Sequence, residues 1–426
     1  MTLSRIGRFG MAFVVSVAMG LGVTSCGGRT IGYMWVLGTQ ANAAAGQQSG
    51  QIVGYKIDNF TGNLTSAVGS PFTSGGTNPV SIVVKPGGRY VYVVNKGVPT
   101  TNPTSCSASV VGNIQVLSVG GDGTLTPQST ANSQGCTPVW AEMSASGDYL
   151  YVLDKLSPAY GKVTNGVTDL NGDITVFAVA ADTGRLSLVT NAQVKDPSGN
   201  QLTYFEVGPT PIMMRSTGGG CLFTVNQGNS TVFPYSVGAS GQLTLTTNST
   251  IQVAGPTTPL LTSIATNGAN VYFTDAANNL ILPYQVGTSC ALNTLTGGSV
   301  PNLALTSNPQ FGFVESTGSF LYILNQSGTN SNNANSTVSA FKIDSATSKL
   351  SPVVGDVLNP YSIGAGPVCM GEDPTSQYLY TSNGTAGTVT GKQINKQTGQ
   401  LSDLARGATF PSTGHATCLV ISGNVQ

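Results

Sequence analysis

The chain has 426 residues, of which only 8% are charged, and its 17 basic and 17 acidic side chains cancel to a formal net charge of zero. Because no basic surface is available, this composition argues against nucleic acid as a partner. The 55 glycines and the lack of apolar patterns with helical spacing predict an all-β protein.

The first 25 residues read as an export signal. Arg5 and Arg8 precede an apolar run from Phe9 to Val23, which is too short for a comfortable transmembrane helix. Small residues then lead into Cys26, as in a bacterial lipoprotein signal whose cysteine is lipidated and becomes the mature N-terminus. The alternative is an ordinary secretory signal with an incidental cysteine. The lipoprotein interpretation predicts a protein of the cell envelope, periplasmic or surface-exposed, whose membrane partner is reached through a lipid anchor at Cys26.

Behind this leader, one unit of four strand-like runs recurs seven times. An apolar strand, usually preceded by proline, leads into a Tyr-rich strand that ends in Asn or Asp, and a third strand and a hairpin closing on leucine follow. The closing leucines recur roughly every 56 residues, at Leu64, Leu125, Leu186, Leu243, Leu292, Leu350 and Leu401. Four strands per unit at this period predict a seven-bladed β-propeller with four antiparallel strands per blade.

The first and last units complete each other. The chain ends with the apolar strand His415–Ser422, where a Tyr-rich strand would be next, and it begins with the Tyr-rich strand Tyr33–Gly38. We expect these two strands to pair in one blade, which closes the ring and leaves no open sheet edge at the seam. Residues 26–426 are therefore expected to form a single domain.

Apart from Cys26, the chain has an even number of cysteines, as is common in an oxidising compartment. Several connectivities are open from sequence alone. Cys106 and Cys136 fall in loops on the same propeller face, and Cys369 and Cys418 lie at matching heights in neighbouring inner strands. These positions favour pairing in chain order, namely Cys106 with Cys136, Cys221 with Cys290, and Cys369 with Cys418.

Two phrases carry a family resemblance: the hairpin DNFTGNL at residues 58–64 and the turn and strand KPGGRYVYVVN at residues 85–95. They resemble the lactonase-type seven-bladed propellers, which are related to 6-phosphogluconolactonase and to muconate cyclo-isomerases, over nearly the whole mature chain. YVTN-type surface propellers share much of this wording, so the resemblance is more specific for fold than for activity. It implies hydrolysis of a sugar or muconate-type lactone around the central channel, without a metal or other cofactor.

Inner strands of this family often begin Pro-x-His, but this sequence departs from that pattern. The positions two residues after each proline are Ser81, Trp140, Met213, Leu261, Phe311 and Cys369. The single histidine, His415, stands near the start of the last inner strand.

The charged residues of the inner strands are few. Glu142 and Arg215 each stand four residues after the proline of their inner strand, in neighbouring blades. Glu372 stands an odd number of residues after its proline, so its side chain should point toward the other neighbouring blade. A carboxylate, a guanidinium and an imidazole that converge could bind a carboxylated lactone and shuttle a proton, which makes Glu142, Arg215 and His415 the candidate catalytic residues. Alternatively, Glu142 and Arg215 form a buried ion pair between blades.

Two functions remain open. The chain is either a monomeric propeller that binds an unknown small molecule or protein on one face, or a lactonase. Convergence of Glu142, Arg215 and His415 on one channel favours the enzyme, whereas mutual pairing or dispersal favours binding. A zinc site is not expected, because one histidine and oxidised cysteines do not supply its ligands.

Overall fold

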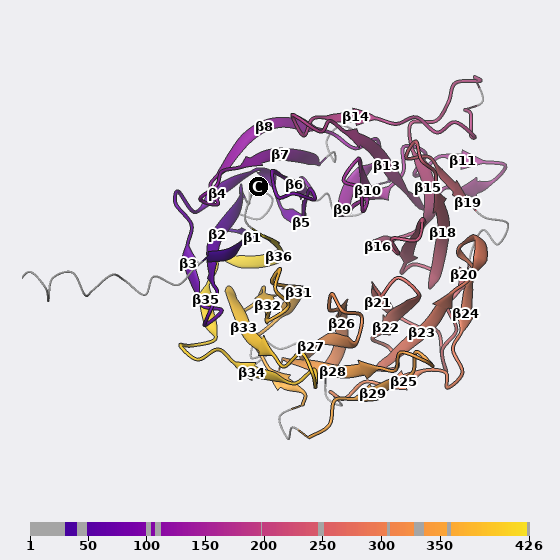
Figure 1. Cartoon of the computed structure of the whole chain (residues 1–426). Coiled ribbons are helices and arrows are strands. Elements are labelled where there is room, and N and C mark those ends of the chain that lie inside the picture. Colours follow the sequence, from indigo (N-terminus) through magenta and orange to yellow (C-terminus); the bar gives the residue numbers. More distant parts are fainter. Residues whose placement is uncertain are drawn as a thin grey trace, which may run out of the picture.

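The computed structural model describes residues 30–40, 49–98, 104–106, 112–196, 198–245, 251–304, 307–327, 336–355 and 359–423. The expected signal sequence and Cys26 lie outside the described residues. Within them, seven antiparallel sheets stand around a central channel as the blades of a propeller (Figure 1). The predicted seven-bladed, all-β architecture is confirmed.

Each blade runs from an inner strand at the channel to an outer strand at the rim. Blade 1 contains β36 (His415–Gly423), β1 (Thr30–Thr39), β2 (Ser49–Asp58) and β3 (Leu64–Ser66). Blade 2 contains β5 (Pro79–Val84), β6 (Tyr90–Asn95), β7 (Asn113–Val119) and β8 (Leu125–Ala131). Blade 3 contains β9 (Cys136–Met143), β10 (Tyr149–Leu156), β13 (Asn171–Val179) and β14 (Leu186–Leu188). Blade 4 contains β16 (Pro211–Ser216), β17 (Cys221–Asn226), β18 (Thr231–Val237) and β19 (Leu243–Leu245).

The last three blades repeat the pattern. Blade 5 contains β21 (Leu261–Thr266), β22 (Asn270–Asp275), β23 (Leu280–Val286) and β24 (Leu292–Thr294), with the 3₁₀ turn η2 (Thr288–Cys290) before β24. Blade 6 contains β26 (Ser307–Val314), β27 (Phe320–Ser327), β28 (Thr337–Ile343) and β29 (Leu350–Pro352). Blade 7 contains β31 (Pro367–Glu372), β32 (Tyr378–Asn383), β33 (Thr388–Ile394) and β34 (Leu401–Asp403).

Short additional strands complete the described structure. In six blades a fifth strand pairs with the third one: β4 (Phe72–Thr77), β15 (Phe205–Pro209), β20 (Ile251–Gln252), β25 (Val300–Pro301), β30 (Tyr361–Ser362) and β35 (Thr409–Pro411). A separate hairpin, β11 (Val163–Thr164) with β12 (Val167–Thr168), extends from the loop between β10 and β13. No helix of the described part is long and apolar enough to span a membrane.

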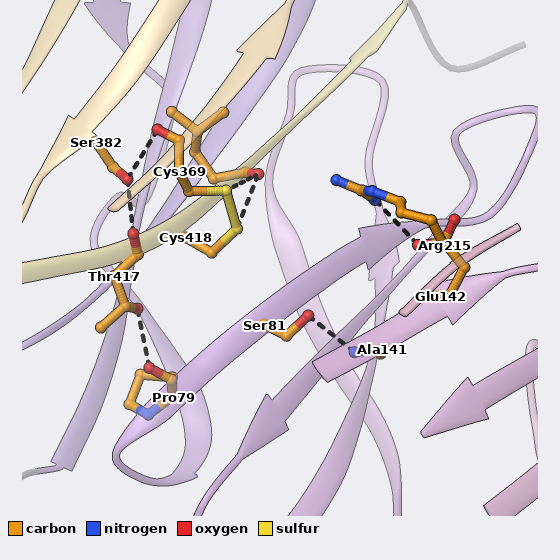
Figure 2. The surroundings of a disulfide bond; sticks show 10 residues. Pro79, Ser81, Ala141, Glu142, Arg215, Cys369, Ser382, Thr417 and Cys418 are labelled. Atoms are coloured by element: carbon orange, nitrogen blue, oxygen red, sulfur yellow. Dashed lines mark hydrogen bonds and ion pairs between the residues drawn. A yellow bond between two sulfur atoms is a disulfide. The ribbon is translucent and has the colours of Figure 1, made fainter. Parts of the chain in front are cut away.

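The ring closes as the sequence predicts. Strand β36 pairs antiparallel with β1, and Tyr33 lies opposite Ser422. In Figure 1 the yellow β36 lies beside the indigo strands of the N-terminal part. The seam is also tied to both neighbours: Thr417 Oγ1 donates to the Pro79 carbonyl of blade 2 at 2.9 Å, and Ser382 Oγ of blade 7 donates to the Thr417 carbonyl at 2.6 Å (Figure 2).

An aromatic latch joins successive blades. The ring of Tyr90 in blade 2 lies against Gly184 in the outer hairpin of blade 3, and the Tyr92 hydroxyl donates to the Gly184 carbonyl at 3.0 Å. Gly184 has φ +66°, and a Cβ there would lie 2.6 Å from the Tyr90 ring, so both backbone and packing require glycine. The same latch joins four more blade pairs, through Tyr33 and Gly123, Tyr149 and Gly241, Phe320 and Gly399, and Tyr378 and Gly62.

Between blades 4 and 5 a disulfide occupies the place of the latch. Cys221 begins β17 as Tyr90 begins β6, and Cys290 stands two residues before the hairpin leucine, as Gly184 does. Cys290 also shares the positive φ of that position, +60°. The two cysteines are bonded, with Cα atoms 5.6 Å apart. The covalent bond therefore links the same two positions that a ring and a glycine link elsewhere.

The other two expected disulfides are also present in the described residues. Cys106 is bonded to Cys136, which ties the loop after β6 to the start of β9. Cys369 is bonded to Cys418, which ties β31 to the seam strand β36 (Figure 2). The pairing in chain order is confirmed, and it indicates an oxidising compartment.

A β-bulge near the start of each inner strand sets which side chains face the channel. In β5 the register steps from Pro79 opposite Asn95 to Ser81 opposite Val94, so that Val80 is the extra residue. In β21 it is Leu261 that lies opposite the strand-ending Asp275, and Ser263 follows the bulge. Counting two residues from the proline therefore assigns the wrong residue in this blade: Leu261 does not occupy the position after the bulge that Ser81 occupies in blade 2. Pro259 lies two residues before the strand, and Ser263 is the corresponding residue.

Candidate functional site

The inner strands enclose two hollows, one at each end of the channel. The charged hollow, of about 460 Å³, lies where the inner strands end and is lined by residues that include Glu142, Arg215 and Glu372. The neutral hollow, of about 360 Å³, lies where the inner strands begin; its lining includes Gln310 and His415. The two ends of the channel therefore offer different chemistry.

Two aromatic side chains separate these hollows. Trp140 of blade 3 and Phe311 of blade 6 line both, and their ring centroids are 6.2 Å apart. Both follow the bulge in their inner strands, at the position that corresponds to Ser81. Two of the residues at the expected histidine positions thus form an apolar plug in the channel.

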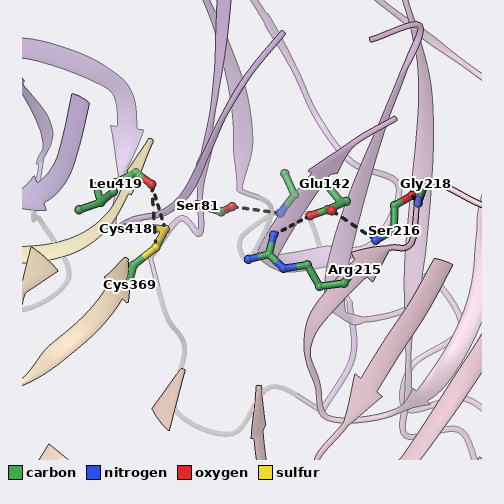
Figure 3. Close-up of polar contacts among 9 residues, drawn as sticks. Ser81, Glu142, Arg215, Ser216, Gly218, Cys369, Cys418 and Leu419 are labelled. Carbon is green, nitrogen blue, oxygen red and sulfur yellow. Dashed lines mark hydrogen bonds and ion pairs between the residues drawn. A yellow bond between two sulfur atoms is a disulfide. The ribbon is translucent and has the colours of Figure 1, made fainter. Parts of the chain in front are cut away.

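Glu142 and Arg215 form an ion pair between blades 3 and 4. Arg215 Nη1 lies 3.0 Å from Glu142 Oε2, and Glu142 Oε1 accepts a hydrogen bond from the Ser216 backbone N–H at 3.3 Å (Figure 3). The guanidinium also lies over the rings of Trp140 and Phe311, 5.1 Å and 5.9 Å from their centroids. The side chains are 24% (Arg215) and 13% (Glu142) exposed, so the pair is partly buried and borders the charged hollow.

Glu372 is a second carboxylate of the charged hollow. It accepts hydrogen bonds from the Ser316 backbone N–H at 2.8 Å and from the Ser316 hydroxyl at 3.4 Å. Ser316 belongs to blade 6, so Glu372 points toward the preceding blade, whereas Glu142 points toward the following one. These opposite directions are the ones predicted from the alternation of side chains along the inner strands. Burial, reinforced by the carboxylates of Glu315 and Asp373, raises the pKa of Glu372 above its usual value.

Glu315 and Asp373 themselves hold the turns that follow the inner strands. Glu315 accepts hydrogen bonds from the backbone N–H groups of Thr317, Ser319 and Phe320. Asp373 does the same for Thr375, Gln377 and Tyr378. Both are nearly fully buried, and their lone pairs are occupied by their own turns.

His415 lies at the other end of the channel. Its Nδ1 is 3.1 Å from the Gly384 carbonyl oxygen, which can only accept, so Nδ1 carries a hydrogen in this contact. The side chain is exposed and lines the neutral hollow. The structure therefore brings Glu142 and Arg215 together and leaves His415 beyond the plug.

Sequence reasoning did not select Glu372, Trp140 or Phe311 as members of the site. The two rings were marked only as departures from the Pro-x-His pattern, and their contact across the channel joins blades 3 and 6. The position of Glu372 along its strand indicated the direction of its side chain. Its neighbours Ser316 and Ser376 lie in turns, and the sequence does not specify how close these turns come to Glu372. The rarity of charge in the inner strands was the available signal.

A second group of buried carboxyls lies in blade 3, away from both hollows. Asp154 and Asp173 are opposite each other on β10 and β13, and both are fully buried. Ser133 Oγ donates to Asp154 at 2.7 Å. Burial raises the pKa of Asp154 to about 7, and burial together with Asp154 raises the pKa of Asp173, so the pair retains a proton near neutral pH. In the part of the chain that the structure describes, no group of three or more His, Cys, Asp or Glu could hold a metal ion.

The comparisons with known proteins agree with the propeller fold. Residues 293–418 match the family model described as "Lactonase, 7-bladed beta-propeller". No curated protein matches the chain. Similar solved structures include a putative 6-phosphogluconolactonase from Bacteroides fragilis, with 16% identity and a TM-score of 0.65, covering 92% of this chain and 98% of that one. Another is a periplasmic gluconolactonase from Pseudomonas aeruginosa, with 18% identity and a TM-score of 0.63, covering 93% of this chain and 100% of that one.

At these identities the solved structures establish the fold, which is a seven-bladed β-propeller closed at blade 1. The family match in the C-terminal part confirms the resemblance seen in the sequence. The chain is a seven-bladed β-propeller whose residues 293–418 match the lactonase family model.

Proposed function

We propose that this propeller is a metal-independent lactonase whose site is the charged hollow. The observation that carries the proposal is the presence of Arg215, Glu142 and Glu372 in one hollow of a lactonase-like channel. The inner strands carry one further ionisable side chain of this kind, His415, at the other end of the channel, so the charged hollow is where carboxylates and a guanidinium occur together.

The chemistry assigns a separate role to each group. Glu372, with its raised pKa, removes a proton from water as the water oxygen attacks the lactone carbonyl carbon. Arg215 stabilises the oxyanion of the tetrahedral intermediate. The ester C–O bond then breaks as the protonated Glu372 returns its proton to the ring oxygen, which leaves a hydroxy acid and regenerates the carboxylate. Glu142 holds Arg215 in place through the 3.0 Å ion pair.

Replacing Glu372 tests this assignment. Glu372→Gln is expected to lower kcat by about 10²–10⁴-fold, because the general base is lost. The melting temperature should change little, because a glutamine oxygen can still accept from Ser316. Turnover is measured on a panel of lactones, with spontaneous hydrolysis subtracted. In the parent enzyme kcat/KM should increase over a higher pH range than it would with an ordinary glutamate as the base, because the raised pKa keeps Glu372 protonated to higher pH.

His415→Ala is the matched control. If the charged hollow is the site, this variant keeps turnover within about twofold of the parent, because its imidazole lies beyond the Trp140 and Phe311 plug. Loss of turnover in His415→Ala with full activity in Glu372→Gln would move the site to the neutral hollow.

A non-catalytic ligand-binding propeller is the second candidate. It is favoured by the mutual neutralisation of Glu142 and Arg215 and by the separation of His415 from them. Trp140 borders both hollows and Trp35 is fully buried, so a ligand in the channel should change the Trp140 fluorescence. A saturable change without turnover of any lactone would support binding.

The proposed setting is the cell envelope, with a lipid anchor at Cys26. The Arg-flanked apolar leader ending in Cys26 and the three disulfides of the described domain support export. A fold neighbour is also named as periplasmic. Cys26→Ser is expected to move the protein from the membrane to the soluble fraction and to remove the lipid mass. Unchanged fractionation and intact mass would instead support an ordinary secretory signal.

A further inference from the structure

We propose that the substrate of the charged hollow is an uncharged lactone, and that Glu142 enforces this choice by occupying Arg215. The inference rests on the proposed lactonase function and adds the charge of the substrate to it. It follows from a census of the charges that face the hollow.

Among the described residues, Arg215 is the one lysine or arginine that lines either hollow. Lys85 is the next cation along the rim, since it follows the lining residue Val84. Its Nζ already donates to the Gly147 carbonyl of blade 3 at 2.6 Å. The internal segments that the structure does not describe contain no lysine or arginine. Among the described residues, no spare cation is therefore available at the hollow to bind a phosphate or a carboxylate.

Arg215 already has a carboxylate partner within the protein, although its side chain still lines the hollow. One side of its guanidinium meets the Glu142 carboxylate at 3.0 Å, and ring faces of Trp140 and Phe311 cover it within 5.9 Å. Strong recognition of a phosphate uses an arginine fork that is free to make two parallel hydrogen bonds. An anionic substrate would have to compete with Glu142 for this fork.

The rest of the lining repels anions. Glu142, Glu372 and Asp373 contribute three carboxylates against one guanidinium. A phosphate brought beside them meets like charge, which selects against the wrong partner. An uncharged lactone avoids this repulsion, and its C–H faces can pack against Trp140, Phe311 and Phe313, which line the same hollow.

Glu142 is the residue through which this selectivity can be changed. The corresponding inner-strand positions in three other blades that line the hollow are uncharged: Val83, Phe313 and Gly371. Glu142→Gln keeps the size of the side chain and an acceptor for the Ser216 N–H, but it releases the guanidinium toward the hollow. The variant should therefore accept an anionic substrate better than the parent does.

The experiment compares kcat/KM for glucono-1,5-lactone and for its 6-phosphate, with spontaneous hydrolysis subtracted. The parent is expected to prefer the uncharged lactone by about tenfold or more, and Glu142→Gln should reduce that preference by about tenfold, mainly through a lower KM for the phosphorylated lactone. Glu206→Gln is the matched control, because Glu206 is exposed in blade 3 and lines neither hollow. It should leave the ratio unchanged.

The outcomes are distinguishable. If the parent hydrolyses neither lactone, the proposed function fails and the inference fails with it. If the parent hydrolyses the phosphorylated lactone with the same kcat/KM as the uncharged one, the inference alone is overturned, whatever the stability of the variant. If the parent prefers the uncharged lactone but a folded Glu142→Gln keeps the same ratio, Glu142 does not set the selectivity.

Discussion

A chain that ends before His415 is expected to lose its cooperative unfolding transition. Strand β36 supplies the inner strand of blade 1, buries Ala416, Cys418 and Leu419, and carries half of the Cys369–Cys418 disulfide. The disulfide, which closes 49 residues, contributes about 4 kcal/mol in the chain-entropy account. A buried leucine adds about 2 kcal/mol. Together these losses rival the roughly 5–15 kcal/mol of net stability of a domain.

Denaturant unfolding followed by circular dichroism measures this effect. The truncated chain should carry Cys369→Ser, so that a free thiol does not confuse the result. The control ends at Gly423, after the last residue of β36. A truncated chain with the same midpoint and the same slope as the control would contradict closure of the ring by β36.

Removal of the disulfide between blades 4 and 5 is expected to have the second large effect, and an aromatic latch should reverse part of it. Replacing both Cys221 and Cys290 by serine removes a cross-link over 69 residues, which should lower the free energy of unfolding by about 2–4 kcal/mol. The pair Cys221→Tyr and Cys290→Gly recreates the ring and glycine of the Tyr90–Gly184 contact. Because Cys290 already has φ +60°, glycine at this position also relieves its backbone.

Chemical denaturation of the parent and the two double variants under identical conditions compares their free energies of unfolding. The Tyr and Gly variant should be more stable than the double serine variant by about 1 kcal/mol or more. Cys221→Phe with Cys290→Gly is the control for the hydroxyl group, because it reproduces the Phe320–Gly399 contact. If the ring variants are no more stable than the double serine variant, the disulfide does not replace a latch.

Much of the fold could be predicted from the sequence because it is a repeat. Each unit cannot bury both faces of its Tyr-rich strand alone, so seven units must stack side by side, and a split first unit must be completed by the last strand. The Cys369–Cys418 pair followed from the same register, since equivalent positions in neighbouring blades lie close together. At six of the seven blade boundaries the sequence also carries the pattern of this contact, namely Tyr, Phe or Cys at the start of one strand and Gly or Cys two residues before the next hairpin leucine.

The candidate site was only partly accessible in this way. The shared register of Glu142 and Arg215 was sufficient to predict an ion pair as one of two outcomes, because register fixes height in the channel. It does not fix where residues from opposite blades meet. The plug of Trp140 and Phe311, which leaves His415 on the far side, depends on side chains that cross the ring between blades 3 and 6.

The sequence by itself determined the number of blades and the closing strand, because these depend on spacing along a repeating chain. It favoured one set of cysteine pairs, and the structure decided among the open connectivities. Only the tertiary structure decided that Ser263, and not Leu261, follows the bulge of its blade, since proline stands two residues earlier there than in the neighbouring units. It also decided which charges share a hollow. Contacts across the channel arise from the curvature of the whole ring, and no local pattern of residues encodes them.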